Sequence, residues 1–313
     1  MTKKKTRTGK TAAAASILDK YEGLKRVLGH AECTTLIAEI VSDCAFFLAD
    51  ETRTLPLKSL VEGKRYFAFQ DKDEKARTSR PINEELYIAD AQELSRQLEK
   101  LKANPALHWL SVDKCNRFLY TLAMSFCAFN DVTSDRDKKT PGTYFELLVG
   151  HLLALTFGVQ PRNRVEVLTV EDERSTLPTD FIFDLGPRQL KFHVPVKIST
   201  RGWVAQAWAH QCVLNGVYGE GRFKGVLVAL AETKLDLQKL EVVEICLPDQ
   251  WAVYQRFVAR MDRIYYLDLP AKYAALATAF PYIPVKTFGE FFAEREALIR
   301  QPGQPRTTRR IAV

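Results

Sequence analysis

The stretch LPTDFIFDLGPRQLKFHVPVKISTR occupies residues 177–201 and decides the fold of the chain. Two apolar runs, 180–185 and 189–197, are joined by a Gly-Pro pair that is typical of a turn between strands. The pattern predicts a β-hairpin in which Asp180 opens the first strand and Lys197 ends the second. Because the open ends of a hairpin lie side by side, we expect these two side chains to be close together.

Strand and helix patterns alternate on both sides of this hairpin. Such alternation predicts an α/β fold, in which a mixed central β-sheet is flanked by helices. The predicted helices cover residues 143–157, 203–215, 250–261 and 287–300, and the predicted strands cover 165–170, 180–185, 189–197, 223–231, 240–247 and 263–269.

The N-terminal part of the chain has helical periodicity in the segments 12–50, 90–102 and 113–128, with a charged loop at 70–81. We therefore expect three regions. Residues 1–135 form a mainly helical region with a basic arm, residues 136–300 form the catalytic core, and residues 301–313 form a basic tail.

The composition is that of a globular protein with a sizeable core. Of the 313 residues, 46% are hydrophobic and 27% are charged. No apolar stretch approaches the roughly 18 residues that span a bilayer, and the basic N-terminus lacks the apolar run of a signal peptide. We expect a cytoplasmic protein with no membrane contact. The six cysteines have no CxxC spacing, which favours reduced thiols over disulfides or metal ligands.

The formal net charge of +7 and the pI of about 9.0 favour a polyanionic partner such as nucleic acid. Much of this excess lies in the two tails, where the alternative interpretation is a solvated end. The segment Thr8–Thr11 (TGKT) lacks the first glycine of a phosphate-binding loop, so no nucleotide cofactor is expected.

Three residues in this region combine into a possible hydrolytic site. Glu146 lies on the apolar helix 143–157, and the hairpin supplies Asp180 and Lys197. Carboxylate oxygens are ligands for Mg²⁺, and a lysine provides positive charge where a phosphodiester transition state becomes more negative. A lone Asp–Lys pair is more often a structural ion pair, so the assignment depends on Glu146 and on the surrounding pattern.

These residues resemble the PD-(D/E)xK nuclease superfamily, and within it the type II restriction endonucleases. Pro178-Thr179-Asp180 stands where the family has Pro-Asp, Glu146 stands at its helical glutamate, and Lys197 stands at its lysine. The resemblance covers about residues 138–215. It implies a restriction-endonuclease-like core, Mg²⁺-dependent and sequence-specific hydrolysis of double-stranded DNA, metal binding by Asp180 and Glu146, and a homodimer.

One position departs from the family pattern. The acidic residue that normally stands two places before the lysine is replaced by Pro195. A subset that recognises CCGG-type sites also lacks this acid and carries a glutamate on the following helix instead, where this chain has His210 and Gln211. We take Gln211 as an accessory catalytic candidate, with His210 as the alternative.

Candidate DNA-binding residues follow Lys197 directly. Ser199, Thr200, Arg201, Trp203 and Gln206 are expected to face the cleft. Arg201 is the best candidate for a base contact, because arginine pairs with guanine in the major groove. Its alternative role is to clamp a phosphate.

Two sets of alternatives remain open. Glu232-Thr-Lys234 also matches ExK but lacks an upstream Pro-x-Asp element, which favours a structural role. For the whole chain, the alternatives are a nuclease-like DNA-binding protein that does not cleave, and a structure-specific DNA repair nuclease.

Overall fold

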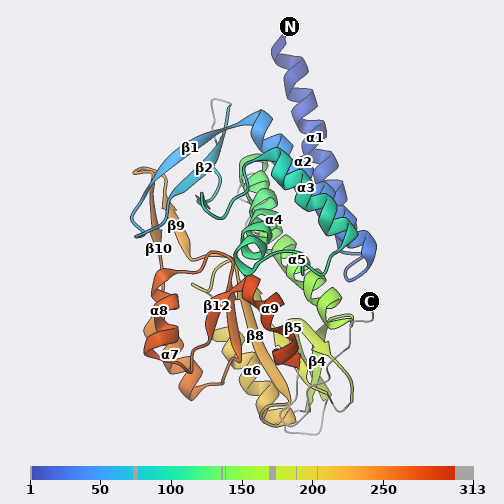
Figure 1. Ribbon diagram of the computed structural model, residues 1–313, viewed down its shortest axis with the longest axis vertical. Coiled ribbons are helices and arrows are strands. Elements are labelled where there is room, and N and C mark those ends of the chain that lie inside the picture. Colours follow the sequence, from blue (N-terminus) through green and yellow to red (C-terminus); the bar gives the residue numbers. More distant parts are fainter. Residues whose placement is uncertain are drawn as a thin grey trace.

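The structure is a computed structural model that describes residues 2–72, 77–134, 137, 139–168, 174–187, 189–202 and 204–299. These residues form two β-sheets and the helices that pack on them (Figure 1). The expected mixed α/β architecture is confirmed. No helix within these ranges is long and apolar enough to cross a membrane.

The central sheet has the strand order β12-β11-β8-β6-β5-β4, and β7 continues beside β8. Strands β6, β7, β8, β11 and β12 run parallel, whereas β5 and β4 join the sheet as an antiparallel edge. The strands are β4 (Arg162–Leu168), β5 (Arg174–Asp184), β6 (Lys191–Val194), β7 (Val196–Lys197), β8 (Phe223–Ala229), β11 (Arg263–Tyr266) and β12 (Val285–Thr287).

Helices cover both faces of this sheet, as parallel strands require. Side chains such as Val194 and Val228 pack beneath α4, α5 and α9, and side chains such as Leu227 and Ala229 pack beneath α6, α7 and α8. The helices are α4 (Val112–Thr133), α5 (Lys139–Phe157), α6 (Val204–Tyr218), α7 (Pro248–Phe257), α8 (Ala271–Ala279) and α9 (Phe288–Ile299).

The N-terminal region is built on α1 (Thr2–Leu24), α2 (Ala31–Glu51) and α3 (Ala91–Ala103), and α1 includes the basic N-terminal residues. Apolar side chains of α1 and α2 share one continuous core with α4, α5 and the central sheet. The expected boundary near residue 135 therefore falls inside a shared core rather than between two separate cores.

A second sheet, with the order β3-β2-β1-β10-β9, was not expected from the sequence. It joins the N-terminal hairpin of β1 and β2 to the later hairpin of β9 and β10, because β1 pairs in parallel with β10. In Figure 1 this sheet lies beside α4, away from α6. Its strands are β1 (Thr52–Ser59), β2 (Tyr66–Asp71), β3 (Ile82–Asn83), β9 (Thr233–Asp236) and β10 (Glu241–Glu244).

A buried polar network fastens the second sheet to the central one. Asp268, which is 1% exposed, accepts hydrogen bonds from Lys64 Nζ at 2.7 Å, from the Tyr66 hydroxyl at 3.1 Å and from Asn83 Nδ2 at 3.1 Å. Lys64 also donates to Glu244 at 2.6 Å. Because each buried polar group has a partner, this junction avoids the cost of a buried unsatisfied group.

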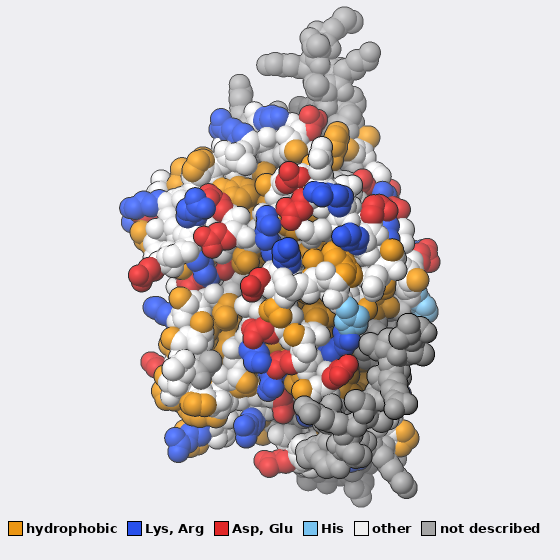
Figure 2. Space-filling model, in the orientation of Figure 1, with side chains coloured by type: hydrophobic (Ala, Val, Ile, Leu, Met, Phe, Trp, Pro, Cys, Tyr) orange, Lys and Arg blue, Asp and Glu red, His pale blue; other side chains and the backbone are white. Residues whose placement is uncertain are grey.

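Surface charge is mixed on the face drawn in Figure 2, where Lys and Arg side chains alternate with Asp and Glu. That face is therefore not a continuous basic surface. All six cysteines are free thiols, and four of them are buried: Cys33, Cys44, Cys115 and Cys127.

The buried His151 gives the fold a predictable response to acid. Its Nδ1 accepts from the amide of Gly29 at 3.2 Å, and its Nε2 lies 2.8 Å from the Thr34 hydroxyl, so the neutral ring joins α5 to the start of α2. Burial, with a smaller contribution from His30, lowers the pKa of His151 to about 4. A histidine in the unfolded chain titrates near 6.5, so protons bind preferentially to the unfolded state between these values.

We expect the free energy of unfolding to fall by about 3 kcal/mol on account of His151 as the pH drops from 6.5 towards 4. The variant His151→Gln keeps a neutral hydrogen-bonding group and should show a shallower decline. Urea denaturation at several pH values measures both slopes. Equal slopes in the two proteins would contradict this assignment.

Candidate active site

The hairpin of β5 and β6 brings Asp180 and Lys197 together as expected. Phe181 pairs with Val194 in an antiparallel register, so Asp180 lies level with the break between β6 and β7. The ammonium of Lys197 donates to Asp180 Oδ2 at 2.7 Å. Asp180 does not open its strand, however, because β5 begins at Arg174 and continues to pair with β4 on the far side.

Pro195 determines the local backbone at this site. It separates β6 from β7, and the amide of Val196 donates to the side chain of Asp180 at 2.8 Å. At the place where the family has an acid, this chain has Pro195, and the amide of the next residue, Val196, holds one carboxylate oxygen of Asp180. Among the described residues no hydrogen bond is made to the other oxygen, Oδ1 of Asp180.

Glu146 approaches this pair from α5. The helix can lie close to β5 because it carries a glycine at the contact, where a Cβ atom on Gly150 would stand 2.5 Å from the Phe181 ring. Burial, which has the largest effect, and the charge of Asp180 raise the pKa of Glu146 to about 7, against the opposing effect of the Lys197 charge. Two carboxylates that repel each other are therefore held together with a single lysine.

The site opens into a pocket of about 160 Å³ between the hairpin and α6. Asp180, Lys197 and Thr179 line it from the strands, and Gln206 and His210 line it from the helix. Within the described ranges, no group of three or more His, Cys, Asp or Glu side chains is arranged to hold a metal ion by itself. Any cation here would need oxygen atoms from water or substrate to complete its coordination.

The same hairpin carries a second Asp–Lys pair that serves as an internal comparison. Lys191 Nζ donates to Asp184 Oδ2 at 2.7 Å, the same distance as in the Asp180 pair. Neither Asp184 nor Lys191 lines the pocket of 160 Å³. Asp184 and Lys191 thus form a structural ion pair, which is the role that the sequence would also have favoured for Asp180 and Lys197 without Glu146.

Comparison with solved structures identifies the fold. The structure is similar to the crystal structure of Type IIP restriction endonuclease Kpn2I, with a TM-score of 0.75 and 21% sequence identity over 90% of this chain and 97% of that chain. The chain has the fold of a restriction endonuclease. No family profile and no curated protein sequence matches it. The complex of restriction endonuclease PspGI with substrate DNA is also similar, at 17% identity over 67% of this chain and 76% of that chain, but its TM-score of 0.38 is too low for inference.

On this restriction-endonuclease fold, Gln211 does not occupy the place expected for an accessory catalytic residue. It is 1% exposed, and it does not line the pocket. Its Oε1 lies 3.0 Å from His193 Nδ1, and its Nε2 donates to Asn215 and to the Phe223 carbonyl. Because α6 turns 100° per residue, His210 faces the pocket while Gln211 faces the sheet.

The loop after Lys197 is held in place by hydrogen bonds to the buried carboxylate of Glu232. This carboxylate is 1% exposed and accepts hydrogen bonds from Ser199 Oγ at 2.7 Å, from the amide and hydroxyl of Thr200 at 2.8 and 2.6 Å, and from the Tyr266 hydroxyl at 2.7 Å. Glu232 therefore has a structural environment, whereas Lys234 is exposed on β9.

This anchoring corrects the expectation for Thr200, which is 1% exposed and bonded to Glu232, so it cannot face DNA. Ser199 is half-buried, and Arg201 and Gln206 are exposed. Trp203, the remaining DNA-binding candidate, lies outside the described residues.

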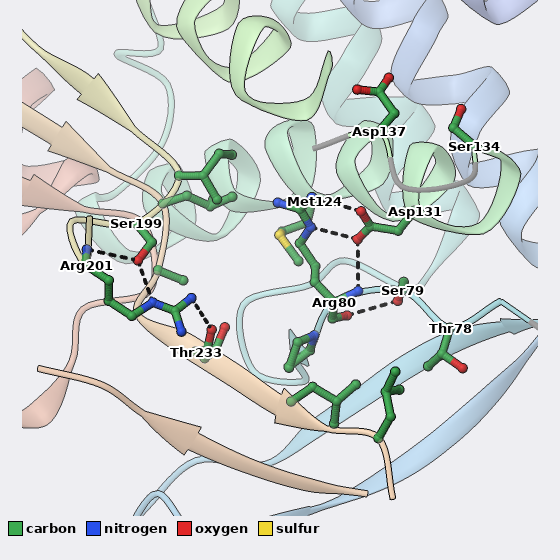
Figure 3. A pocket seen from close by; sticks show the side chains of 16 residues that line it. Thr78, Ser79, Arg80, Met124, Asp131, Ser134, Asp137, Ser199, Arg201 and Thr233 are labelled. Atoms are coloured by element: carbon green, nitrogen blue, oxygen red, sulfur yellow. Dashed lines mark hydrogen bonds and ion pairs between the residues drawn. The ribbon is translucent and has the colours of Figure 1, made fainter. Parts of the chain in front are cut away.

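A second and larger cavity, of about 510 Å³, lies next to this loop (Figure 3). Ser199 and Arg201 line one side, while Arg80 and Asp131 line the other and form a bidentate ion pair with distances of 2.7 and 2.9 Å. Arg201 donates to Ser199 Oγ at 2.9 Å and to the Thr233 carbonyl at 3.0 Å. Its guanidinium is thus held in place with N–H groups to spare.

Replacement of Glu232 by alanine should destabilise the fold by about 3 to 5 kcal/mol, because it leaves buried donors of Thr200 and Tyr266 without an acceptor. Glu232→Gln retains a carbonyl oxygen for these donors and should cost less. Urea denaturation measures both values. A loss below about 1 kcal/mol for the alanine variant would contradict the structural role.

Proposed function

We propose that the protein is a site-specific DNA endonuclease of the type II restriction class, which hydrolyses phosphodiester bonds in double-stranded DNA. The observation that carries this proposal is the pairing of Asp180 with Lys197 in one pocket on a restriction-endonuclease fold. Glu146 lies on α5, close enough for the charges of both residues to act on its carboxyl group. We propose further that Asp180, Glu146 and Lys197 are the residues of a PD-(D/E)xK motif.

The residues present fit a magnesium ion. Asp180 has an oxygen that takes no hydrogen bond from the described residues, and Glu146 has an elevated pKa that a nearby cation would relieve. Magnesium is commonly held by one or two carboxylates together with waters and substrate phosphate oxygens, which agrees with the small number of protein ligands at this pocket. When bound, it would activate water and offset the charge of the phosphate.

The side chains of this chain then have separable roles. Asp180 is fixed by the Val196 amide and would hold the cation through its other oxygen. Glu146 would support the same cation from α5. Lys197, 18% exposed in the pocket wall, would place positive charge beside the phosphate as negative charge develops there.

Recognition of the DNA would depend on the exposed side chains next to the pocket. Arg201 is already oriented by Ser199 and Thr233, and it is the residue best placed to contact a guanine or a phosphate. Ser199 and Gln206 are the other candidates, whereas Thr200 is no longer one. A homodimer on a two-fold symmetric site would allow both strands to be cut.

Pro195 agrees with the CCGG-recognising subset, which also lacks an acid before the lysine. The absence of a glutamate on the following helix departs from that subset, so membership of it is part of the proposal only. The same two features favour a second candidate, a nuclease-like protein that binds DNA without cleaving it. That candidate predicts salt-dependent DNA binding and no cleavage with either magnesium or manganese.

Digestion of long double-stranded DNA of known sequence tests the proposal. The purified full-length protein should give discrete fragments with Mg²⁺ and none when EDTA removes the metal. Binding without cutting would replace the proposal by the non-cleaving candidate. Cutting confined to branched or damaged DNA would replace it by a structure-specific repair nuclease.

A further inference from the structure

His193 is a fully buried histidine in the wall of the candidate active-site pocket. It lies on β6 between Phe192 and Val194, which point into the core on the α5 side, so its ring points towards α6. The ring is 0% exposed and lines the pocket with Asp180 and Lys197. Its Nε2 has no hydrogen-bond partner among the described residues.

The hydrogen bonds of Gln211 determine which nitrogen of His193 carries the proton. Gln211 Nε2 donates to the carbonyl of Phe223, which can only accept, so Gln211 Oε1 must face His193. An amide oxygen accepts, and His193 Nδ1 is therefore the protonated nitrogen. In the neutral ring this leaves Nε2 with a free lone pair.

Burial keeps the ring of His193 neutral. Burial lowers the pKa of His193 to about 4, an effect that the hydrogen bond to Gln211 opposes. The titratable groups that act on it are His210 from α6, whose ring centre is 6.1 Å away, Asp180 from β5 and Lys197 from β7. Asp180 favours protonation, and His210 and Lys197 disfavour it.

The pocket has space for water. It also contains a second polar atom without a hydrogen-bond partner among the described residues. The hydroxyl oxygen of Thr179 is also buried without a hydrogen bond, and Thr179 lines the same pocket. A volume of about 160 Å³ holds several waters, each of which occupies roughly 30 Å³ in the liquid. Because Mg²⁺ prefers oxygen ligands, a water molecule fits the nitrogen lone pair of His193 better than a directly bound Mg²⁺.

We propose that His193 is a further catalytic residue, whose Nε2 accepts a hydrogen bond from the water that attacks the phosphodiester. This inference rests on the proposed nuclease function. Nε2 orients this water and is not itself protonated. The water oxygen forms a bond to phosphorus, and its proton passes to solvent through the waters of the pocket. The bond from phosphorus to the leaving oxygen breaks, and that oxygen takes a proton from solvent. Gln211 is the positioning residue that keeps the lone pair turned towards the pocket.

Two substitutions separate the two ring nitrogens. In His193→Asn the amide takes the place of Nδ1, so the bond to Gln211 is kept and the lone pair in the pocket is lost. In His193→Gln the amide oxygen reaches the place of Nε2. An amide oxygen can orient a water molecule as Nε2 does. We therefore expect the single-turnover cleavage rate to fall about 10²-fold in His193→Asn and to stay within about tenfold of wild type in His193→Gln. DNA affinity should change little in either variant, whereas His193→Gln leaves the buried Gln211 Oε1 without its donor and should unfold at a lower temperature than His193→Asn.

The protonation state is accessible without a substitution. Nitrogen-15 NMR of the full-length protein at neutral pH should show a His193 ring with a protonated Nδ1 and a bare Nε2, and the signal can be assigned by its absence from His193→Gln. A protonated Nε2 would overturn the inference.

Kinetics distinguish this inference from the function on which it rests. Wild-type cleavage with an unchanged rate in His193→Asn would overturn the role of His193 and leave the nuclease proposal standing. Equal losses in both variants would also overturn it, because the position of the lone pair would then not matter. A wild-type protein that does not cut DNA would overturn the nuclease proposal itself.

Discussion

Lys197→Ala should lower the rate of DNA cleavage by about 10³-fold while DNA affinity stays within a few-fold of wild type. The ammonium lies in the pocket wall, 2.7 Å from Asp180, where it would offset charge that develops in the transition state. It also opposes the rise in the pKa of Glu146, so its loss should make that carboxylate harder to ionise. Single-turnover cleavage and a filter-binding assay measure the two effects.

Lys191→Ala is the matched control for this variant. It removes a lysine from the same hairpin and breaks an Asp–Lys pair of the same length, but outside the pocket. We expect cleavage close to wild type. If Lys197→Ala cut as fast as Lys191→Ala, Lys197 would be no more than the partner of a structural ion pair.

Asp180→Asn should abolish detectable cleavage, with a loss of at least about 10³-fold, and should weaken Mg²⁺ binding by more than about tenfold. The amide keeps the shape of the carboxylate and can still accept from Val196, so the fold should be preserved. What it loses is the charge that a cation requires. Calorimetric titration of Mg²⁺ into the protein measures binding independently of activity.

Asp184→Asn is the corresponding control, because Asp184 lies on the same strand and pairs with Lys191 away from the pocket. It should retain both Mg²⁺ binding and cleavage. Equal Mg²⁺ affinity in Asp180→Asn and the wild type would contradict the assignment of Asp180 as a metal ligand.

The central part of the fold was predictable because its signals are local. Two apolar runs and a Gly-Pro turn mark the hairpin, and they place Asp180 beside Lys197 in space although the two residues are 17 positions apart in the chain. The limits of the first strand were less accessible. Ser175 to Pro178 pair only with β4 at the sheet edge and most of them are exposed, so their sequence resembles a loop.

The second sheet had no comparable local signal. It depends on the pairing of β1 with β10, whose residues Lys58 and Glu241 are far apart in the sequence. The sequence pattern predicts a charged loop at 70–81 and no strands for the residues of β1 and β2 before it. Such long-range pairing cannot be inferred from the periodicity of either strand alone.

Within the site, the errors arise from side-chain direction. Gln211 was chosen by its distance along the chain from Lys197, but the rotation of α6 turns it towards the sheet and presents His210 to the pocket. Thr200 follows the lysine closely yet is turned inward by Glu232. His193 stands in an apolar strand and resembles a core residue until its bond to Gln211 shows which nitrogen is free.

The most direct test of the account is to sequence the ends of the fragments that the purified protein produces from long double-stranded DNA in the presence of Mg²⁺. We predict that every end lies at a fixed position in one short, two-fold symmetric sequence, and that Lys197→Ala produces no such ends. Ends distributed without a common sequence, or the same ends from Lys197→Ala, would contradict the claim that this pocket is the active site of a site-specific endonuclease.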